Sequence, residues 1–417
     1  MMSFIIFLEK NGFLFMLLFC LGVLSPDLTN KVGLMDLELD ERNSSISGSN
    51  LFKQVFWISL FLFFSFRFIF SEKMQPFRHL AKNRILLLIL LCCVALISAT
   101  WSNYPSYTIK RSIFQLIYCT SLAIAFCFVI YHNNLDSTLK IAMCICIGLT
   151  LLTVVLGVAF NSDMKLVSFT KSKNTFGINL AVLITMTYMM MKTFNFKSTS
   201  INILMLALFV LLILTQSKTS IFLVLVYMLV VNLSAFKINV TIVSLSLIFF
   251  SIFILIPGVS YYLHDYKHIA LFVEPEFLTG RGIIWDALYY DLSFFNKLAL
   301  GYGYGSYFEV GIIPFVLDDV YSFIRYITSA HNGYLQLLLQ FGVVGSFIIF
   351  VILVSTVFNT KVLYLTAGLI IPIIHNVTEA SIFRDSNMVW FMMIVIITAS
   401  SITSPKRARL GEKQRIN

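Results

Sequence analysis

Long apolar blocks separated by short polar segments make up most of this chain. Each block runs for about 17–22 residues, the length that a helix needs to cross about 30 Å of hydrocarbon. Predicted spans fall at residues 5–25, 51–71, 84–100, 112–131, 138–160, 175–191, 199–215, 219–235, 239–257, 332–355, 361–375 and 388–403. The pattern therefore predicts an all-α integral membrane protein with about twelve transmembrane helices.

Composition excludes a soluble protein. Hydrophobic residues make up 59% of the 417 and charged residues 12%, whereas soluble domains carry about 25% charged residues. The net charge of +10 does not indicate nucleic-acid binding, because much of the basic charge lies in short loops and in the C-terminal tail. All seven cysteines lie within apolar blocks, where we expect small core residues rather than metal or redox pairs.

The distribution of charge among the loops predicts the orientation. The loop 72–84 holds four Lys or Arg residues and the tail 404–417 holds five, whereas the loop 26–50, on the opposite side, holds five acidic and two basic residues. The positive-inside rule places both termini in the cytoplasm. We expect N-terminal transmembrane helices (1–100) that contribute only apolar spans, further transmembrane helices (101–257), one large outer loop (258–331), C-terminal transmembrane helices (332–403) and a basic cytoplasmic tail (404–417).

The outer loop is the one segment large enough to fold outside the membrane. Within it, residues 281–295 place Trp285, Leu288 and Leu292 at helical spacing, which predicts an amphipathic helix near the membrane surface. The glycine-rich run 301–305 that follows predicts a flexible turn.

Basic residues also lie on the outer side, against the orientation rule. They are Lys110, Arg111, Lys165, Lys171, Lys173, Lys218, Arg281, Arg325 and Arg384. Any single one is explained by a side chain that reaches lipid headgroups. As a group they favour an anionic, lipid-linked substrate, because a diphosphate is best held by guanidinium and ammonium donors.

Among six histidines, His331 is the strongest candidate for chemistry. It lies where the outer loop re-enters the membrane, and the positive end of the helix that follows favours a neutral imidazole. An imidazole is suited to remove a hydroxyl proton at neutral pH. A hydrogen-bonded anchor is the competing interpretation. His264 and His268 share a helical face that could bind a metal, but no third ligand is evident nearby, and His375 has a structural or supporting role.

The run Ala330–Gln336 (AHNGYLQ), with the pair Gly342 and Gly345, resembles a signature of the O-antigen ligase and polymerase superfamily. Thr279-Gly280-Arg281 with Trp285 and the glycine-rich run 301–305 also match. So do Trp101-Ser102 with Pro105, Lys110-Arg111-Ser112, Lys173-Asn174 with Gly177, Ser217-Lys218-Thr219, and Asn376 with Glu379. The resemblance extends from about residue 101 to residue 390 and keeps the family's order.

This resemblance implies a membrane-embedded, GT-C-like glycosyltransferase that inverts the sugar configuration and needs neither metal nor cofactor. It implies a bacterial inner-membrane protein whose active face is periplasmic. The donor would be a glycan on undecaprenyl diphosphate, and the partners would be an acceptor glycan, membrane lipids and a chain-length regulator. The implied catalytic residues are His331 and its helper Glu379. The implied diphosphate-binding residues are Arg281, Lys218 and Lys173, supported by Asn332, Tyr334, Trp285 and Asn376.

Several activities remain open at this point. A polymerase would join lipid-linked repeat units into O-antigen, capsule or exopolysaccharide, and the motifs favour this branch slightly. A ligase would move finished polymer to lipid A–core. A polysaccharide transporter or lipid flippase is disfavoured, because the predicted span interiors are nearly free of charge apart from Arg67. A purely structural membrane protein is the remaining alternative.

Overall fold

The computed structural model describes residues 2–28, 51–233, 239–253, 281–310 and 327–403. The helices are α1 (Met2–Cys20), α3 (Leu51–Phe70), α4 (Gln75–Ile97), α5 (Pro105–Tyr131), α6 (Leu135–Val155), α7 (Lys173–Phe194), α8 (Thr199–Thr215), α9 (Lys218–Leu233), α10 (Val240–Phe253), α12 (Arg281–Phe294), α13 (Gly333–Asn359), α14 (Leu363–Gly368), α15 (Ile370–Thr378) and α16 (Met388–Ile402). In the described ranges, β pairing is limited to a bridge between Phe160 and Leu166.

The helices confirm an all-α membrane protein. Seven helical segments of the described chain are long and apolar enough to cross a membrane: α1, α3, α4 with its short 3₁₀ extensions, α5, α6, α7 and α13. Shorter apolar helices occupy 199–215, 218–232, 363–378 and 388–402. Each predicted span overlaps a helix, but the count of twelve crossings stays a prediction.

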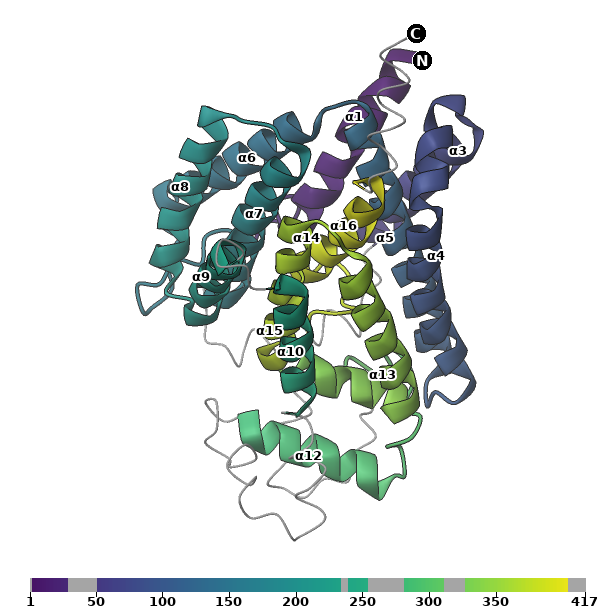
Figure 1. The fold of residues 1–417 in the computed structure, drawn as a ribbon. Coiled ribbons are helices and arrows are strands. Elements are labelled where there is room, and N and C mark those ends of the chain that lie inside the picture. Colours follow the sequence, from purple (N-terminus) through teal and green to yellow (C-terminus); the bar gives the residue numbers. More distant parts are fainter. Residues whose placement is uncertain (1, 29–50, 234–238, 254–280, 311–326, 404–417) are drawn as a thin grey trace.

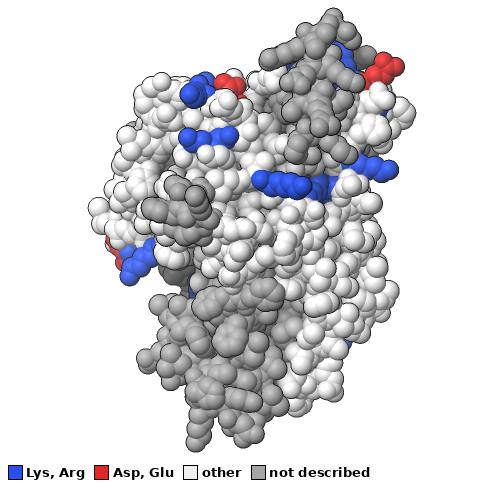
Figure 2. All heavy atoms as spheres, in the orientation of Figure 1, with Lys and Arg blue, Asp and Glu red and all other residues white. Residues whose placement is uncertain are grey.

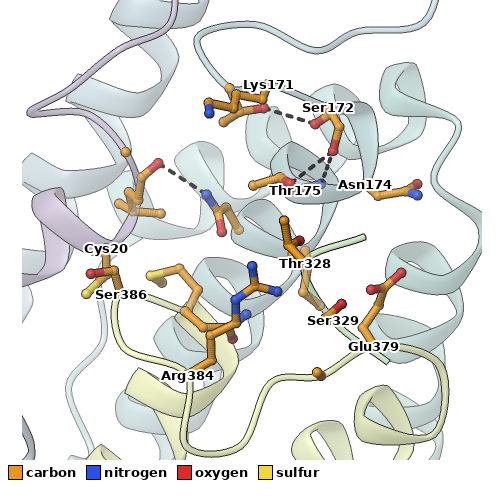
Figure 3. Close-up of a pocket in the computed structure, with 18 of the residues that line it drawn as sticks. Cys20, Lys171, Ser172, Asn174, Thr175, Thr328, Ser329, Glu379, Arg384 and Ser386 are labelled. Atoms are coloured by element: carbon orange, nitrogen blue, oxygen red, sulfur yellow. Dashed lines mark hydrogen bonds between the residues drawn. The ribbon is translucent and has the colours of Figure 1, made fainter. Parts of the chain in front are cut away.

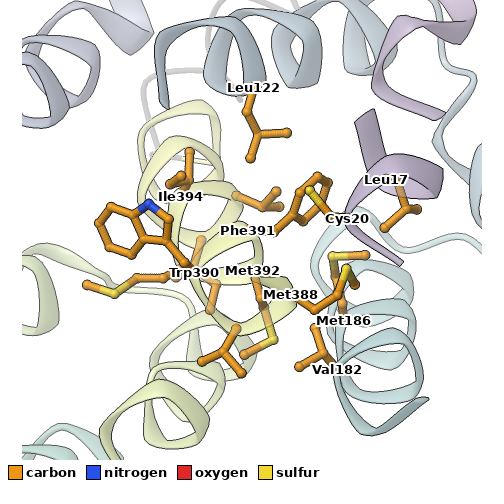
Figure 4. Close-up of a cluster of buried hydrophobic side chains, with 14 of the residues drawn as sticks. Leu17, Cys20, Leu122, Val182, Met186, Met388, Trp390, Phe391, Met392 and Ile394 are labelled. Carbon is orange, nitrogen blue, oxygen red and sulfur yellow. The ribbon is translucent and has the colours of Figure 1, made fainter. Parts of the chain in front are cut away.

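Helix α16, one of the shorter apolar helices, lies at the centre of the bundle. Almost every residue of α16 from Met388 to Ala399 is buried, and the helix packs against α1, α4, α5 and α7. Figure 4 shows Phe391 and Met388 facing Leu17 and Cys20 of α1, with Val182 and Met186 of α7 beside them. A helix that is apolar all round is buried inside a bundle, and α16 is such a helix.

The outer surface of the bundle is apolar as well. Phe66 of α3, Leu206 of α8 and Phe347 of α13 each expose about 60% or more of their surface. The face drawn in Figure 2 is largely uncharged, with a few basic and acidic groups. Large exposed apolar areas in a helical bundle are typical of lipid contact. Arg67 of α3 forms an ion pair with Glu9 of α1, and the paired atoms lie 2.7 Å apart.

Helix α13 is broken at Gly342, where φ is +62° and ψ is −169°. The helix changes direction there (Figure 1). The loop before it fills the break: Tyr302 N donates to Leu339 O at 2.7 Å and Val343 N donates to Leu298 O at 2.9 Å. A side chain at Gly342 would collide with the Ala299 carbonyl, since a Cβ there would lie 2.2 Å from its oxygen.

The glycine-rich run 301–305 is therefore not the flexible turn that the sequence predicted. Four of its five residues are buried. Tyr304 OH also donates to Phe383 O at 2.8 Å, which ties the run to the segment before α16. Glycine supplies positive φ at Gly301 and Gly303 so that the backbone can enter the α13 break.

Helix α12 confirms the amphipathic helix predicted at 281–295. It lies across the end of the bundle that is opposite the start of α1 (Figure 1). Trp285, Leu288 and Leu292 are buried in a second apolar cluster with Tyr302 and Leu339. Its buried stripe thus faces the first half of α13 and the glycine-rich run.

Candidate active site

A polar cavity of about 430 Å³ lies where several helix ends meet. The end of α1, the starts of α7 and α16, the end of α15 and the segment 328–331 line it. The predicted alternation of spans places all these ends on the outer face, so the cavity occupies the side expected for chemistry. Figure 3 shows side chains from separate elements converging there, including Ser172, Ser329, Glu379 and Arg384.

His331 and Glu379 face each other in this cavity. His331 Nδ1 lies 3.3 Å from Glu379 Oε2. On the other side of the carboxylate, Arg281 Nη2 donates to Glu379 Oε1 at 2.7 Å, and Arg281 Nη1 donates to Thr378 O. The structure thus brings together three of the predicted site residues. His331 and Arg281 lie 48 and 98 positions before Glu379 in the sequence.

The electrostatics keep Glu379 ionised. Burial raises the pKa of this carboxyl, but the hydrogen bond and charge interaction with His331, together with the charge of Arg281, outweigh burial and lower its pKa from the usual 4.5 to about 2. An ionised carboxylate beside Nδ1 holds the imidazole proton on that nitrogen. Nε2 is then the basic nitrogen of His331.

The backbone around His331 is held in an unusual conformation. His331 has φ +46°, in the left-handed region that non-glycine residues seldom adopt. Asn332 caps α13, and its Oδ1 accepts from the backbone N–H groups of Tyr334 and Leu335 at 3.0 and 3.1 Å. Trp285 Nε1 donates to Ala330 O at 3.1 Å. The predicted supporting residues Asn332 and Trp285 therefore fix the chain on both sides of the histidine.

Tyr334 and Asn376 fix the other wall. Tyr334 OH donates to Ile373 O at 2.9 Å, which joins α13 to α15. Asn376 Oδ1 accepts from Ser381 N at 3.2 Å and is pressed against Gly333, where a Cβ would lie 1.8 Å from that oxygen. Only glycine allows so close an approach. The segment that carries Glu379 is thereby set opposite the start of α13.

Lys173 and Lys218 begin α7 and α9, and their charges lie close enough to interact. The two helix starts pack tightly, because a Cβ at Gly177 would lie 2.7 Å from Ser217 Cβ. The neighbours Lys171, Ser172, Asn174 and Thr175 line the cavity. Lys173 and Lys218 themselves are not among the described residues that line the cavity, and Arg281 contacts the lining residue Glu379.

Sequence reasoning missed residues from the N-terminal helices. Residues 1–100 were expected to contribute apolar spans alone. In the structure, Ser25 and Asp27 line the cavity, and Lys53 of α3 forms an ion pair with Asp385, a second lining residue. Lys53 and Asp385 are 332 positions apart, and no local pattern relates them.

Arg384 was recognised only as one of the outer basic residues. It lines the main cavity and also a second one of about 120 Å³, which shares Thr328, Ser329, Ala380 and Asp385 with the first. The sequence contains no pattern that predicts the Arg384 side chain at these cavities.

Groups of three or more metal-ligating side chains do not occur among the described residues. His264 and His268 lie outside them. His375 is buried at the end of α15, and its Nδ1 lies 2.6 Å from Ser381 Oγ, in keeping with a structural role.

One comparison with known proteins found a match. Residues 203–351 match the family model described as O-Antigen ligase, which confirms the resemblance to the O-antigen ligase and polymerase superfamily. The matched stretch includes Lys218, Arg281 and His331, whereas Lys173 and Glu379 lie on either side of it. No curated protein and no solved structure matches the chain.

Proposed function

We propose that this chain, whose residues 203–351 carry the O-Antigen ligase match, is a glycosyltransferase of the bacterial inner membrane that polymerises lipid-linked oligosaccharides. It would act on the periplasmic face with both termini in the cytoplasm. The donor is a glycan on undecaprenyl diphosphate, and the acceptor is a sugar hydroxyl of another lipid-linked repeat unit. The observation that carries the proposal is the His331–Glu379 contact in a polar cavity at the ends of apolar helices.

The chemistry requires a base and a place for negative charge. The acceptor oxygen attacks the anomeric carbon of the donor while His331 Nε2 takes its proton. The bond between that carbon and the diphosphate oxygen breaks, and undecaprenyl diphosphate leaves with the electron pair. A single displacement inverts the anomeric configuration. Glu379 stabilises the imidazolium that forms, as a carboxylate does beside a catalytic histidine.

The cavity also provides for an anion. The starts of α7 and α16 line it, and α13 starts two residues after His331. Helix N-termini carry partial positive charge, and three together favour a diphosphate. We assign Lys218 and Lys173, at two adjacent helix starts, to the lipid-side phosphate. The sequence also predicts Arg281 as a diphosphate-binding residue, but its contacts with Glu379 and the Thr378 carbonyl favour a role in orienting Glu379. Lysine offers the charge without the bidentate geometry of arginine.

A mutational test addresses the catalytic assignment. His331→Ala and Arg281→Ala should abolish polymer formation while the protein still inserts in the membrane. Purified variants in proteoliposomes, supplied with undecaprenyl-diphosphate-linked repeat units, would be compared by gel electrophoresis of the products. Near-normal polymer from either variant contradicts the roles assigned here.

The alternative within the same family is a ligase that transfers finished polymer to lipid A–core. Deletion of the gene separates the two activities. Loss of a polymerase leaves single repeat units on the acceptor lipid, whereas loss of a ligase leaves long polymer on undecaprenyl diphosphate. Slight likeness of the motifs around Arg281 and His331 to the exopolysaccharide branch favours polymerisation, and a chain-length regulator is the expected partner.

A transporter or flippase is the alternative from another class. It needs polar groups along a path through the membrane midplane. Within the described helices, Arg67 is paired with Glu9, and the cavity gathers its polar groups at the helix ends. Movement of lipid-linked glycan across vesicles that contain the purified protein would favour transport instead.

A further inference from the structure

Arg281 and Arg384 differ in how their guanidinium groups are used. Arg281 is committed to Glu379 and to the carbonyl of Thr378. Among the described residues, no hydrogen bond or ion pair is recorded for the side chain of Arg384, which is exposed to the cavity. Figure 3 shows it reaching into the cavity beside Thr328 and Ser329, with Glu379 across from it.

The backbone that carries Arg384 is held firmly. Tyr304 OH donates to the carbonyl of Phe383 at 2.8 Å, and Asp385, the next residue along, pairs with Lys53. Phe383 has φ +63° and Ser386 has φ +61°, so the turn contains two left-handed residues. Contacts from the glycine-rich run and from α3 thus fix a turn whose strained conformation directs one arginine into the cavity.

An arginine with open donors on an ordered turn is suited to an anion. Its five N–H groups match phosphate oxygens in bidentate geometry, and little backbone freedom is lost on binding because the turn is already ordered. The starts of α7 and α16 line the same cavity and add to the positive potential. The Asp385 carboxylate forms its ion pair with Lys53 and interacts with the charge of Arg384 only at longer range.

We infer that Arg384 is the arginine that receives the diphosphate of the lipid-linked donor, whereas Arg281 mainly holds Glu379 in position against His331. This inference rests on the proposed function and names a ligand-binding residue outside the motifs of the family resemblance. Its place between the two cavities sets the diphosphate at their shared wall. The second cavity, bordered by Tyr304, Gln336 and Gln340, then lies on the far side of the scissile bond.

The test measures binding and turnover separately. Undecaprenyl diphosphate without sugar is the probe, and its affinity for the purified full-length protein in nanodiscs is compared between wild type, Arg384→Gln and Arg384→Lys. Loss of a charge-assisted, bidentate contact should weaken binding by about ten- to a hundredfold in Arg384→Gln, with partial recovery in Arg384→Lys. Lys361→Gln, which removes an exposed cation between α13 and α14, is the charge-matched control and should bind as wild type does.

Kinetics supply the second readout. Arg384→Gln should raise the donor KM more than it lowers kcat, whereas Arg281→Gln should lower kcat through Glu379 and leave probe binding within about threefold of wild type. Unchanged probe binding in a folded Arg384→Gln protein overturns the inference about Arg384. If the wild-type protein polymerises the substrate in the same assay, the proposed function is still supported. An equal loss of binding in Lys361→Gln also overturns it, because net charge would then be the cause. A wild-type protein without turnover removes the proposed function itself.

Discussion

His331 Nδ1 lies 3.3 Å from Glu379 Oε2, and the same carboxylate accepts from Arg281 at 2.7 Å through its other oxygen. The loop arginine, the membrane-boundary histidine and the residue that follows α15 thus form one chain of contacts. Its consequence is that the charge of Glu379 affects His331 and Arg281 together. Removal of that charge should disturb the imidazole tautomer as well as the position of the arginine.

Glu379→Gln tests this dependence. Glutamine keeps the size of the side chain and loses the negative charge, so the imidazole proton is no longer held on Nδ1. We expect polymerisation to slow by about 10²–10⁴-fold, the range typical of general-base catalysis. The initial rate of polymer formation in proteoliposomes is the measurement, and the amount of inserted protein is the control. A variant within twofold of the wild-type rate would remove Glu379 from the mechanism.

The depressed pKa of Glu379 gives a stability prediction. Its folded-state pKa of about 2 lies below the usual 4.5, so the folded state gains stability that is present above pH 4.5 and is lost as the pH falls from 4.5 towards 2. The difference in Tm between wild type and Glu379→Gln should therefore shrink over that window. Thermal unfolding in detergent at pH 6, 4 and 3 measures it, and a difference that stays constant contradicts the linkage.

Much of the fold was predictable because apolar periodicity is a local signal. The spacing of Trp285, Leu288 and Leu292 predicted α12, and apolar blocks located the bundle helices. The break in α13 was not predictable, since Gly342 lies in an apolar run and a single glycine is tolerated in a helix. Its conformation is set by contact with Ala299, 43 residues earlier in the chain.

The residues of the candidate site could be predicted only where they belong to motifs of the family resemblance. The roles of His331, Arg281 and Glu379 came largely from the family resemblance, and the structure shows them in contact. Arg384 and Lys53 carried no such signal. Burial by tertiary packing places Lys53 beside Asp385, and amino-acid sequence alone does not state which distant segments will meet.

Gly342→Ala tests whether the break in α13 is required. Alanine would have to adopt φ +62° and would place its Cβ 2.2 Å from Ala299 O, so we expect a loss of about 1–3 kcal/mol in the free energy of unfolding. Gly148→Ala is the matched control, because Gly148 lies in α6 and a Cβ there meets nothing within 4 Å. Chemical denaturation in detergent measures both. Equal stability of the two variants would show that the break is not under constraint.

Asp291 of α12 offers a test of the outer layer that does not involve the cavity. Burial raises the pKa of its carboxyl to about 7, and the nearby hydroxyl groups of Tyr302 and Tyr307 only partly offset this rise. The folded-state pKa lies above the usual 3.8. The contribution of Asp291 to the free energy of unfolding is therefore fully present below pH 3.8 and is lost as the pH rises towards 7. Asp291→Asn should therefore be more stable than wild type by a margin that grows from pH 4.5 to pH 7 and is constant above it. Thermal unfolding at pH 4.5, 6 and 8 measures the margin, and one that does not change with pH contradicts a buried, titrating carboxyl beneath the glycine-rich run.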